Sequence, residues 1–335
     1  MKYRLTLAAG CLVAGATLQA DTVDNFDGNG TPSTFDQFGA GDAPRILGGG
    51  PTGDFLRLIN RQNSQNNSVS YDLTDPGQFS SVDASFHFSA NNGNSAADGF
   101  SFTLAPTGEF GTMGTGVPWG TPGFAVAEEP NRGGVFAVGF DLWQGINEIS
   151  GHWNGRNQVS VNPDPNATVD LNSGVRHLAD IEVQRVGNGS NVKVTITPDA
   201  NAPLAITAVE PGAAGMIDIT FDSVDGYGYA VDAAPTATGP WSEIVGGITG
   251  TGGSTTAGVP SDPVTKEFYR VRRTGPPPFI YYDNVMPNML PYENRVQFAG
   301  RTGGANTDVE IDNLLVTYAA VTFTANKPPS SFMMR

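Results

Sequence analysis

Cysteine and charged residues are both scarce in this sequence of 335 residues. Its one cysteine is Cys11, so no disulfide can form within the chain and a packed core has to hold the fold together. Charged residues make up 15% of the sequence, against about 25% in an average globular protein. Beyond residue 20, no apolar run reaches the roughly 20 residues of a membrane-spanning helix, which argues against membrane insertion. The 43 glycines and 24 prolines favour strands and tight turns over helices.

Residues 1–20 have the features of a secretory signal peptide. Lys2 and Arg4 form a basic start, an apolar run follows, and Ala20 ends a stretch of small residues. The sequence therefore predicts a bacterial protein that is secreted, extracellular or at the cell surface, with the periplasm as an alternative. A different interpretation places a lipoprotein cleavage site before Cys11.

Basic residues are outnumbered by acidic ones. Removing Lys2 and Arg4 with the signal peptide leaves 16 of the 18 basic residues against 33 acidic ones, a net charge of −17. Nucleic acid is excluded as a partner, because its phosphates require basic groups. Anionic lipid surfaces are excluded for the same reason. Neutral glycans and divalent cations remain as ligand classes.

Apolar and polar residues alternate along much of the chain, which is the pattern of half-buried strands. The expected strands include residues 82–88, 100–104, 136–142, 181–183, 192–196, 296–298 and 314–318. No convincing amphipathic helix accompanies them. An antiparallel β-sandwich is the architecture that this pattern predicts.

Residues 203–275 form a candidate inserted module. They contain their own strand patterns, a tryptophan at 241 and a Tyr-Arg-Val motif at 269–271. This order is similar to a fibronectin type III-like β-sandwich; a long decorated loop is the alternative. The proline run at 276–278 makes a stiff spacer after the module.

The remaining mature chain forms one discontinuous domain in this interpretation. It comprises residues 21–202 and 276–318, and residues 319–335 are a loose C-terminal tail. An all-β sandwich of this size is ordinary for a single domain.

Three separated motifs resemble the legume-type (L-type) lectin family, whose fold is the concanavalin A-like jelly roll. The motifs are Ala-Asp-Gly-Phe-Ser-Phe at 97–102, Phe-Ala-Val-Gly-Phe-Asp-Leu-Trp at 136–143 and Val-Gln-Phe-Ala-Gly-Arg-Thr-Gly-Gly at 296–304. Their order and spacing fit the family once the insert is removed. The resemblance implies an all-β, concanavalin A-like jelly-roll sandwich, interrupted here by the small second β-sandwich module.

The resemblance also implies a sugar site. Asp98 would be the family's aspartate, held by an unusual peptide bond and accepting hydrogen bonds from sugar hydroxyls, and Thr302 and Gly303 would lie beside it. From the residues themselves, Gly120 and Gly123 would let backbone approach a ligand, and Asn147 could offer an amide. The predicted carbohydrate-binding residues are Asp98, Gly120, Gly123, Asn147, Thr302 and Gly303. In the structural alternative the aspartate caps a turn and the glycines form turns.

Three tryptophans are candidates for an apolar platform under a sugar ring. They are Trp119, Trp143 and Trp153, and for each of them core packing is the competing interpretation.

The metal site of the family is altered in this sequence. Gly139 stands where the family has a glutamate, and Gln158 aligns with its histidine, so we expect no transition metal. Asn147 follows Asp141 by six residues instead of the family's four. Asp141 and Asn147, with Glu148 and backbone carbonyls, could still supply part of a calcium shell of six to eight oxygens.

One motif of the sequence is similar to an enzymatic one. Glu310-Ile311-Asp312 resembles the start of the catalytic strand of laminarinase-type glycoside hydrolases, which share this fold. The second glutamate of those enzymes is replaced by Leu314, and half of a carboxylate pair cannot carry out retaining hydrolysis. We expect Asp312-Asn313 to turn or bulge the strand instead.

Together these features predict an exported, non-enzymatic protein that binds a polysaccharide or glycoconjugate. The alternative from another class is a structural surface, matrix or adhesion protein with the same fold and no sugar binding. A glycoside hydrolase or lyase ranks third.

Overall fold

The computed structural model describes residues 21–320 with short gaps. The gaps are residues 29–31, 33, 51–52, 122–125, 163–169, 199–202, 205, 214, 224–226, 238, 252, 261–267, 276–278 and 291. The predicted signal peptide and the proline spacer lie outside the described residues. So does the predicted tail from residue 321 on, whereas its first two residues, 319 and 320, belong to the last strand.

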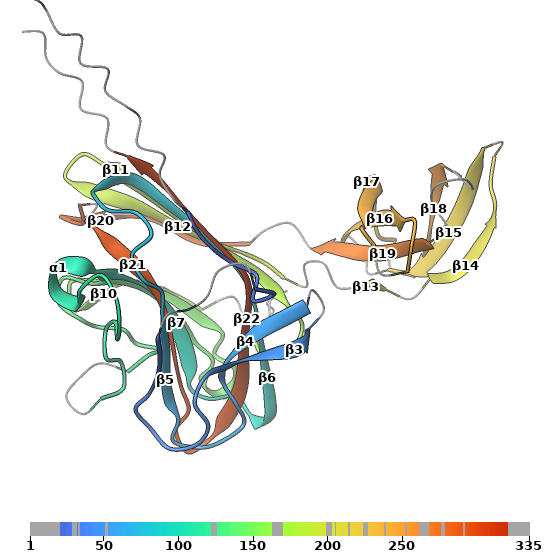
Figure 1. The fold of residues 1–335 in the computed structure, drawn as a ribbon. Helices are drawn as coiled ribbons and strands as arrows, with labels where there is room; N and C mark the ends of the chain where they lie inside the picture. Colours follow the sequence, from blue (N-terminus) through green and yellow to red (C-terminus); the bar gives the residue numbers. More distant parts are fainter. Residues whose placement is uncertain are drawn as a thin grey trace, which may run out of the picture.

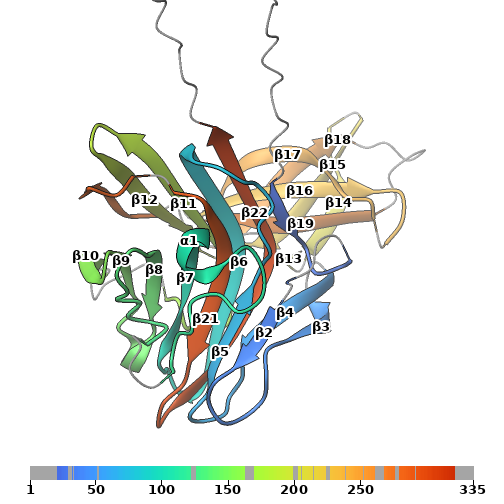
Figure 2. The ribbon, with the colours of Figure 1, turned by 60° about the vertical axis from the view of Figure 1, so that its left-hand side comes forward.

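Two antiparallel sheets form the body of the protein (Figures 1 and 2). The first has eight strands, in the order β20-β12-β11-β6-β22-β4-β3, and β1 pairs with β22. Its strands are β1 (Thr22–Asp24), β3 (Arg45–Gly50), β4 (Gly53–Ile59), β6 (Phe79–Ser95), β11 (His177–Val186), β12 (Gly189–Thr197), β20 (Phe279–Pro287) and β22 (Asn306–Ala320).

The second sheet has seven strands in the order β10-β9-β8-β7-β21-β5-β2. They are β2 (Thr34–Gln37), β5 (Asn66–Ser70), β7 (Gly99–Pro106), β8 (Phe136–Asp141), β9 (Glu148–Trp153), β10 (Arg156–Val161) and β21 (Asn294–Arg301). Strands distant in sequence are neighbours in both sheets, as in a jelly roll.

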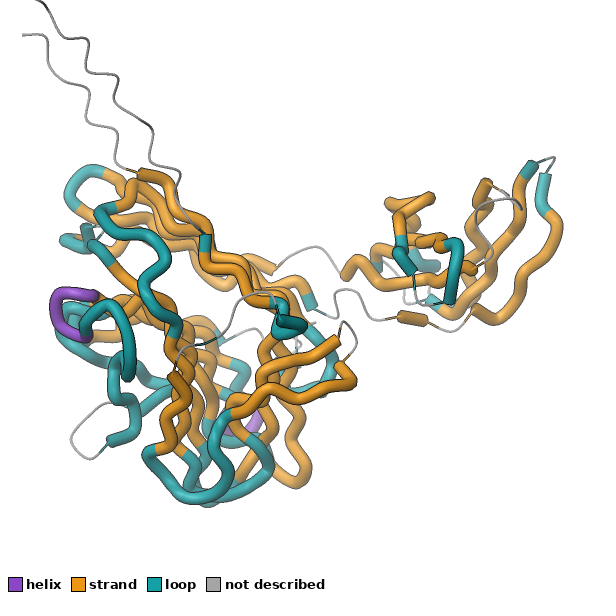
Figure 3. The backbone as a smooth tube through the Cα atoms, in the orientation of Figure 1, coloured by secondary structure: helices purple, strands orange, loops and turns teal. Residues whose placement is uncertain are grey.

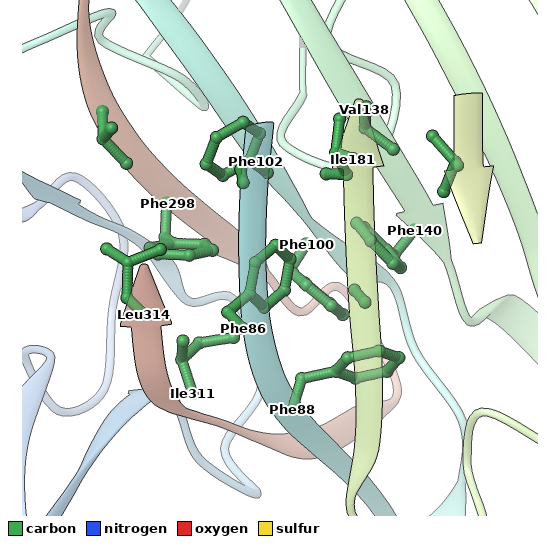
Figure 4. Close-up of a cluster of buried hydrophobic side chains, with 14 of the residues drawn as sticks. Phe86, Phe88, Phe100, Phe102, Val138, Phe140, Ile181, Phe298, Ile311 and Leu314 are labelled. Atoms are coloured by element: carbon green, nitrogen blue, oxygen red, sulfur yellow. The ribbon is translucent and has the colours of Figure 1, made fainter. Parts of the chain in front are cut away.

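Phenylalanines from both sheets fill the space between them (Figure 4). Because side chains alternate along a strand, every second residue of β6, β7 and β8 points to this core. Phe100 of β7 and Phe140 of β8 stack with ring centres 4.3 Å apart. Phe88 of β6 contacts both rings, with centres 5.3 Å from each. The predicted alternation and the predicted all-β jelly-roll sandwich are confirmed.

Seven strands lie between β12 and β20 in the chain and form two further sheets, placed to one side of the body (Figures 1 and 3). One sheet contains β13 (Pro203–Leu204), β16 (Gly228–Ala234), β17 (Ser242–Thr249) and β19 (Phe268–Gly275); the other contains β14 (Ile206–Pro211), β15 (Met216–Asp222) and β18 (Ser254–Pro260). They enclose a hydrophobic cluster of their own, which includes Phe221 and Tyr229. The likeness to fibronectin type III stays a prediction.

Helical structure is minimal in the described part of the chain. It consists of α1 (Thr107–Phe110) and the 3₁₀ helix η1 (Trp143–Gly145). Among the described residues, therefore, no helix has the length and hydropathy needed to cross a membrane.

The predicted irregularity at Asp312-Asn313 is confirmed. The pairing of β22 with β6 shifts between Asp312 and Leu315, and Asn313 has φ of 50°. Asparagine tolerates this left-handed conformation better than other residues with a Cβ. Leu314 then returns to the core, where it is buried, and Leu315 faces out.

This bulge gives a stability prediction. Asn313→Val should lower the free energy of unfolding by about 1–2 kcal/mol, because a β-branched residue disfavours positive φ. Asn313→Gly, the matched control, should change it by no more than about 1 kcal/mol. Urea denaturation measures both, and equal losses in the two variants would show that φ at this position carries no cost.

Candidate functional site

A row of residues crosses one end of the seven-stranded sheet. Strand pairing places them in the order Glu148, Asp141, Gly99, Arg301 and Asn66. The residues next to Gly99 and Asp141 on their strands point into the core, so these two positions face away from it. Three charged side chains, those of Asp141, Glu148 and Arg301, thus lie at one sheet end although Arg301 is distant in the sequence from the other two.

Arg301 joins two buried carboxylates beside this row. Its Nη2 lies 2.5 Å from Oδ2 of Asp98 and 2.9 Å from Oε1 of Glu128. The side chains of Asp98 and Glu128 are only 6% and 7% exposed, whereas that of Arg301 is 30% exposed. Buried carboxylates need such a partner, because an unpaired buried charge is costly.

Glu128 is a site residue that the sequence did not reveal. Burial raises its pKa to about 7; Arg301 opposes the rise, and Asp98 and Asp141 add to it. It lies in the segment between α1 and β8 and belongs to none of the three motifs. Two glycines make room for it: a Cβ on Gly99 would lie 2.9 Å from the Cβ of Glu128, and one on Gly139 would overlap its carbonyl oxygen.

The same overlap concerns Gly139, which the resemblance aligns with a metal-binding glutamate. No side chain fits at Gly139 without a shift of the backbone at Glu128, so the family's glutamate has no space there. Gln158, aligned with the family's histidine, donates a hydrogen bond to the carbonyl of Trp153 at 3.2 Å.

Asp98 is held from several directions. Its N–H donates to the carbonyl of Arg301 at 3.2 Å, and its own carbonyl accepts from the N–H of Leu142 at 2.9 Å. Burial raises the pKa of its carboxyl, and the Arg301 charge opposes this. The unusual peptide bond that the resemblance implied is not found here: the cis peptide bond of the described residues is Gly239–Pro240, so the bond before Asp98 is trans.

Gly303 lies beside Asp98, and Thr302 is the residue before it. Thr302 is buried, and its Oγ1 donates to the carbonyl of Gln62 at 2.5 Å and accepts from the N–H of Gln65 at 3.0 Å. A Cβ at Gly303 would lie 2.8 Å from Oδ2 of Asp98. The small residue is therefore needed for this close approach.

The two other predicted glycines differ in outcome. Gly120, with φ of 78°, lies against the side chain of Asn66, at the end of the row of strand residues. Gly123 lies outside the described residues.

Asp141 and Asn147 hold hydrogen bonds within the protein. Oδ1 of Asp141 accepts from the N–H of Trp143 at 2.8 Å. Oδ1 of Asn147, which has φ of 54°, accepts from Nδ2 of Asn172 at 3.1 Å. In the described part of the chain no three His, Cys, Asp or Glu side chains are grouped to hold a metal ion. As arranged, these residues do not fit a calcium ion with six to eight oxygen ligands.

The candidate tryptophans have different environments. Trp119 is buried and its Nε1 donates to Oγ1 of Thr103 at 3.2 Å, so the core-packing interpretation holds for it. Trp153 stacks on Tyr292 with ring centres 5.9 Å apart. Trp143, two residues after the end of β8 and the first residue of η1, is 38% exposed. Of the three, only Trp143 is among the exposed large hydrophobic side chains.

The hydrolase-like motif lies on the other sheet. Asp312 is fully buried, with Oδ2 2.5 Å from Nη1 of Arg176. Glu310 is 3.9 Å from the same guanidinium. Leu314, which stands at the sequence position of the second glutamate of those enzymes, is buried in the core. Arg176 thus binds a structural carboxylate in this region.

Comparisons with known proteins gave matches at the level of structure. No family model matches the sequence, and no curated protein matches it either. The metal-free form of the VIP36 exoplasmic/lumenal domain is similar at a TM-score of 0.45 and 11% identity, covering 92% of this chain and 94% of that one. Lectin UEA-II complexed with galactose is similar at 0.42 and 14%, covering 85% and 92%. The Emp47p carbohydrate recognition domain is similar at 0.41 and 10%, covering 91% and 97%.

Proposed function

We propose that this chain is an exported, non-catalytic glycan-binding protein whose site lies at the end of the seven-stranded sheet. The observation that carries the proposal is the exposed ring of Trp143 next to Asp141, whose carboxylate accepts the N–H of Trp143. Sugars present C–H groups that pack on an aromatic face and hydroxyls that both donate and accept hydrogen bonds. An exposed tryptophan beside carboxylates offers partners for both.

Each neighbour of Trp143 has a role in this proposal. Asp141 and Glu148, opposite each other on β8 and β9, supply acceptors, and Asn147 between them supplies an amide. Arg301, which is partly exposed, supplies donors. The Asp98 side chain is buried and ion-paired, so we assign it to holding Arg301 and the loop at Gly303 in place. Only its small exposed part would contact the sugar.

The test is a glycan array probed with the folded chain, first with calcium and then with a chelator. Trp143→Ala should weaken binding about tenfold or more, because one aromatic stacking contact is worth about 0.5–1.5 kcal/mol beyond its buried area. Phe35→Ala is the matched control: Phe35 is also 38% exposed but lies on β2, an edge strand of the same sheet. It should leave binding unchanged.

The outcomes separate the alternatives. Loss of binding on chelation would show that the loop from Asp141 to Asn147 recruits calcium by rearranging. If the folded protein binds no glycan on the array, the glycan proposal is wrong and a structural or adhesive function is favoured. In that function Arg301, Asp98 and Glu128 only stabilise the end of the sheet. If Trp143→Ala leaves glycan binding unchanged, the glycan site does not lie at this end of the sheet.

A further inference from the structure

A trough lies on the outer face of the eight-stranded sheet, on the other side of the body from the proposed glycan site. Its volume is about 420 Å³. One row of its lining crosses five neighbouring strands, in the order Leu315, Ser85, Asp180, Thr195 and Ile280. At about 4.8 Å per strand this row spans about 19 Å. The two aliphatic ends are 41% and 51% exposed, and the middle is polar.

A second row runs beside the first, two residues further along each strand. It contains Thr317, Asp83, Glu182 and Lys193. Nζ of Lys193 lies 2.7 Å from Oε1 of Glu182, so this lysine neutralises that carboxylate. Asp283, opposite Lys193 on β20, accepts a hydrogen bond from Nδ2 of Asn191.

The trough is therefore negative at its centre. With Glu182 and Lys193 paired, Asp83 and Asp180 leave about two negative charges facing the cavity. Burial raises the pKa of both carboxyls, and the charge of Glu182 raises them further. Ser85 donates a hydrogen bond to Asp180, and Lys193 opposes the rise there. A cation in the trough would relieve this repulsion.

Thr195 provides an independent sign of a ligand. It stands at the middle of the first row, between Asp180 and Ile280, and is only 7% exposed. Its Oγ1 is buried and has no hydrogen-bond partner among the described residues. Such a group in a lined cavity is costly unless a bound molecule satisfies it.

We propose that the trough binds a small molecule that carries an ammonium group on an aliphatic or sugar body. The ammonium would lie between Asp83 and Asp180 and donate to Oγ1 of Thr195, and the body would pack on Ile280 or Leu315. An organic cation fits better than a metal ion, because the described residues hold no grouped set of three metal-ligating side chains. This site is separate from the proposed glycan site and lies on the other sheet.

Calorimetric titration of the full chain tests the proposal with four probes. They are 1,5-diaminopentane with its neutral counterpart 1,5-pentanediol, and glucosamine with its neutral counterpart glucose. We expect at least one amine to bind and its neutral counterpart not to bind. The amine that binds more tightly shows whether the body of the ligand is aliphatic or a sugar.

Three variants locate the binding. Asp180→Asn should weaken it about tenfold, and Thr195→Val, which keeps the shape of the side chain, several-fold. Asp283→Asn removes a carboxylate from the same sheet outside the trough and should change affinity less than twofold at physiological salt. Thermal unfolding of each variant checks that it is folded.

The proposal is overturned if neither amine binds, or if a neutral counterpart binds equally well to the Trp143→Ala variant, in which the proposed glycan site is removed. It is also overturned if Asp180→Asn weakens amine binding no more than Asp283→Asn does. Trp143→Ala should leave amine binding unchanged, so failure of this site and failure of the proposed glycan site are distinguishable.

Discussion

Arg301→Met is expected to lower the free energy of unfolding by about 3–5 kcal/mol at pH 7.5. The methionine keeps the aliphatic length of the arginine but leaves Asp98 and Glu128 buried without their shared partner. Removing one member of a buried ion pair costs this much, because the carboxylates left behind must either stay charged without a partner or take up a proton. Urea denaturation gives the value directly.

The control for this prediction is Arg132→Met. Arg132 pairs with Glu109 at 2.6 Å, but both side chains are well exposed, so less than about 1 kcal/mol should be lost. Adding Asp98→Asn and Glu128→Gln to Arg301→Met should recover most of the stability. Equal losses in the two single variants would mean that Arg301 stabilises nothing beyond an ordinary surface pair.

Glu128→Gln should make the protein less sensitive to rising pH. In the folded chain burial raises the pKa of Glu128 to about 7, against 4.5 for the ordinary side chain. The folded state therefore binds more protons than the unfolded state between these values, and stability falls as the pH rises through this window. The total loss for a shift of this size is about 3 kcal/mol.

The measurement compares wild type and variant by urea denaturation at pH 4.5 and pH 7.5. Glutamine has no proton to lose, so the stability of the variant relative to the wild type should increase by about 3 kcal/mol between the two pH values. Glu109→Gln is the control, since it removes a carboxyl group from an exposed ion pair with Arg132 and shows any general effect of such a substitution. A flat difference for Glu128→Gln would show that its carboxyl titrates normally.

Much of the fold follows from alternation alone. Phe86, Phe100 and Phe140 all lie in strands that the pattern predicted, because a sheet with one buried face requires apolar residues at every second position. The bulge at Asn313 was also predictable, since the apolar alternation changes register between Ile311 and Leu314. Local chemistry specifies such features.

The candidate site was only partly predictable. Asp98 and Gly303 were identified from motifs, and the structure places them in close approach. Glu128 lies outside any periodic segment, so no sequence pattern points to it, and the third motif gives no sign that Arg301 pairs with two carboxylates. The state of Asp98, covered and ion-paired, depends on both of these residues.

Local sequence patterns are enough to predict alternating strands, tight turns, the lack of a disulfide and an excess of acidic residues. Which of the charged side chains lie together depends on the tertiary structure. The row at the end of the seven-stranded sheet joins positions 66, 99, 141, 148 and 301, and the trough joins five strands from positions 83 to 317. The physical reason is that a strand's own sequence sets which face is buried, whereas its neighbours and register come from long-range pairing, which no local pattern encodes.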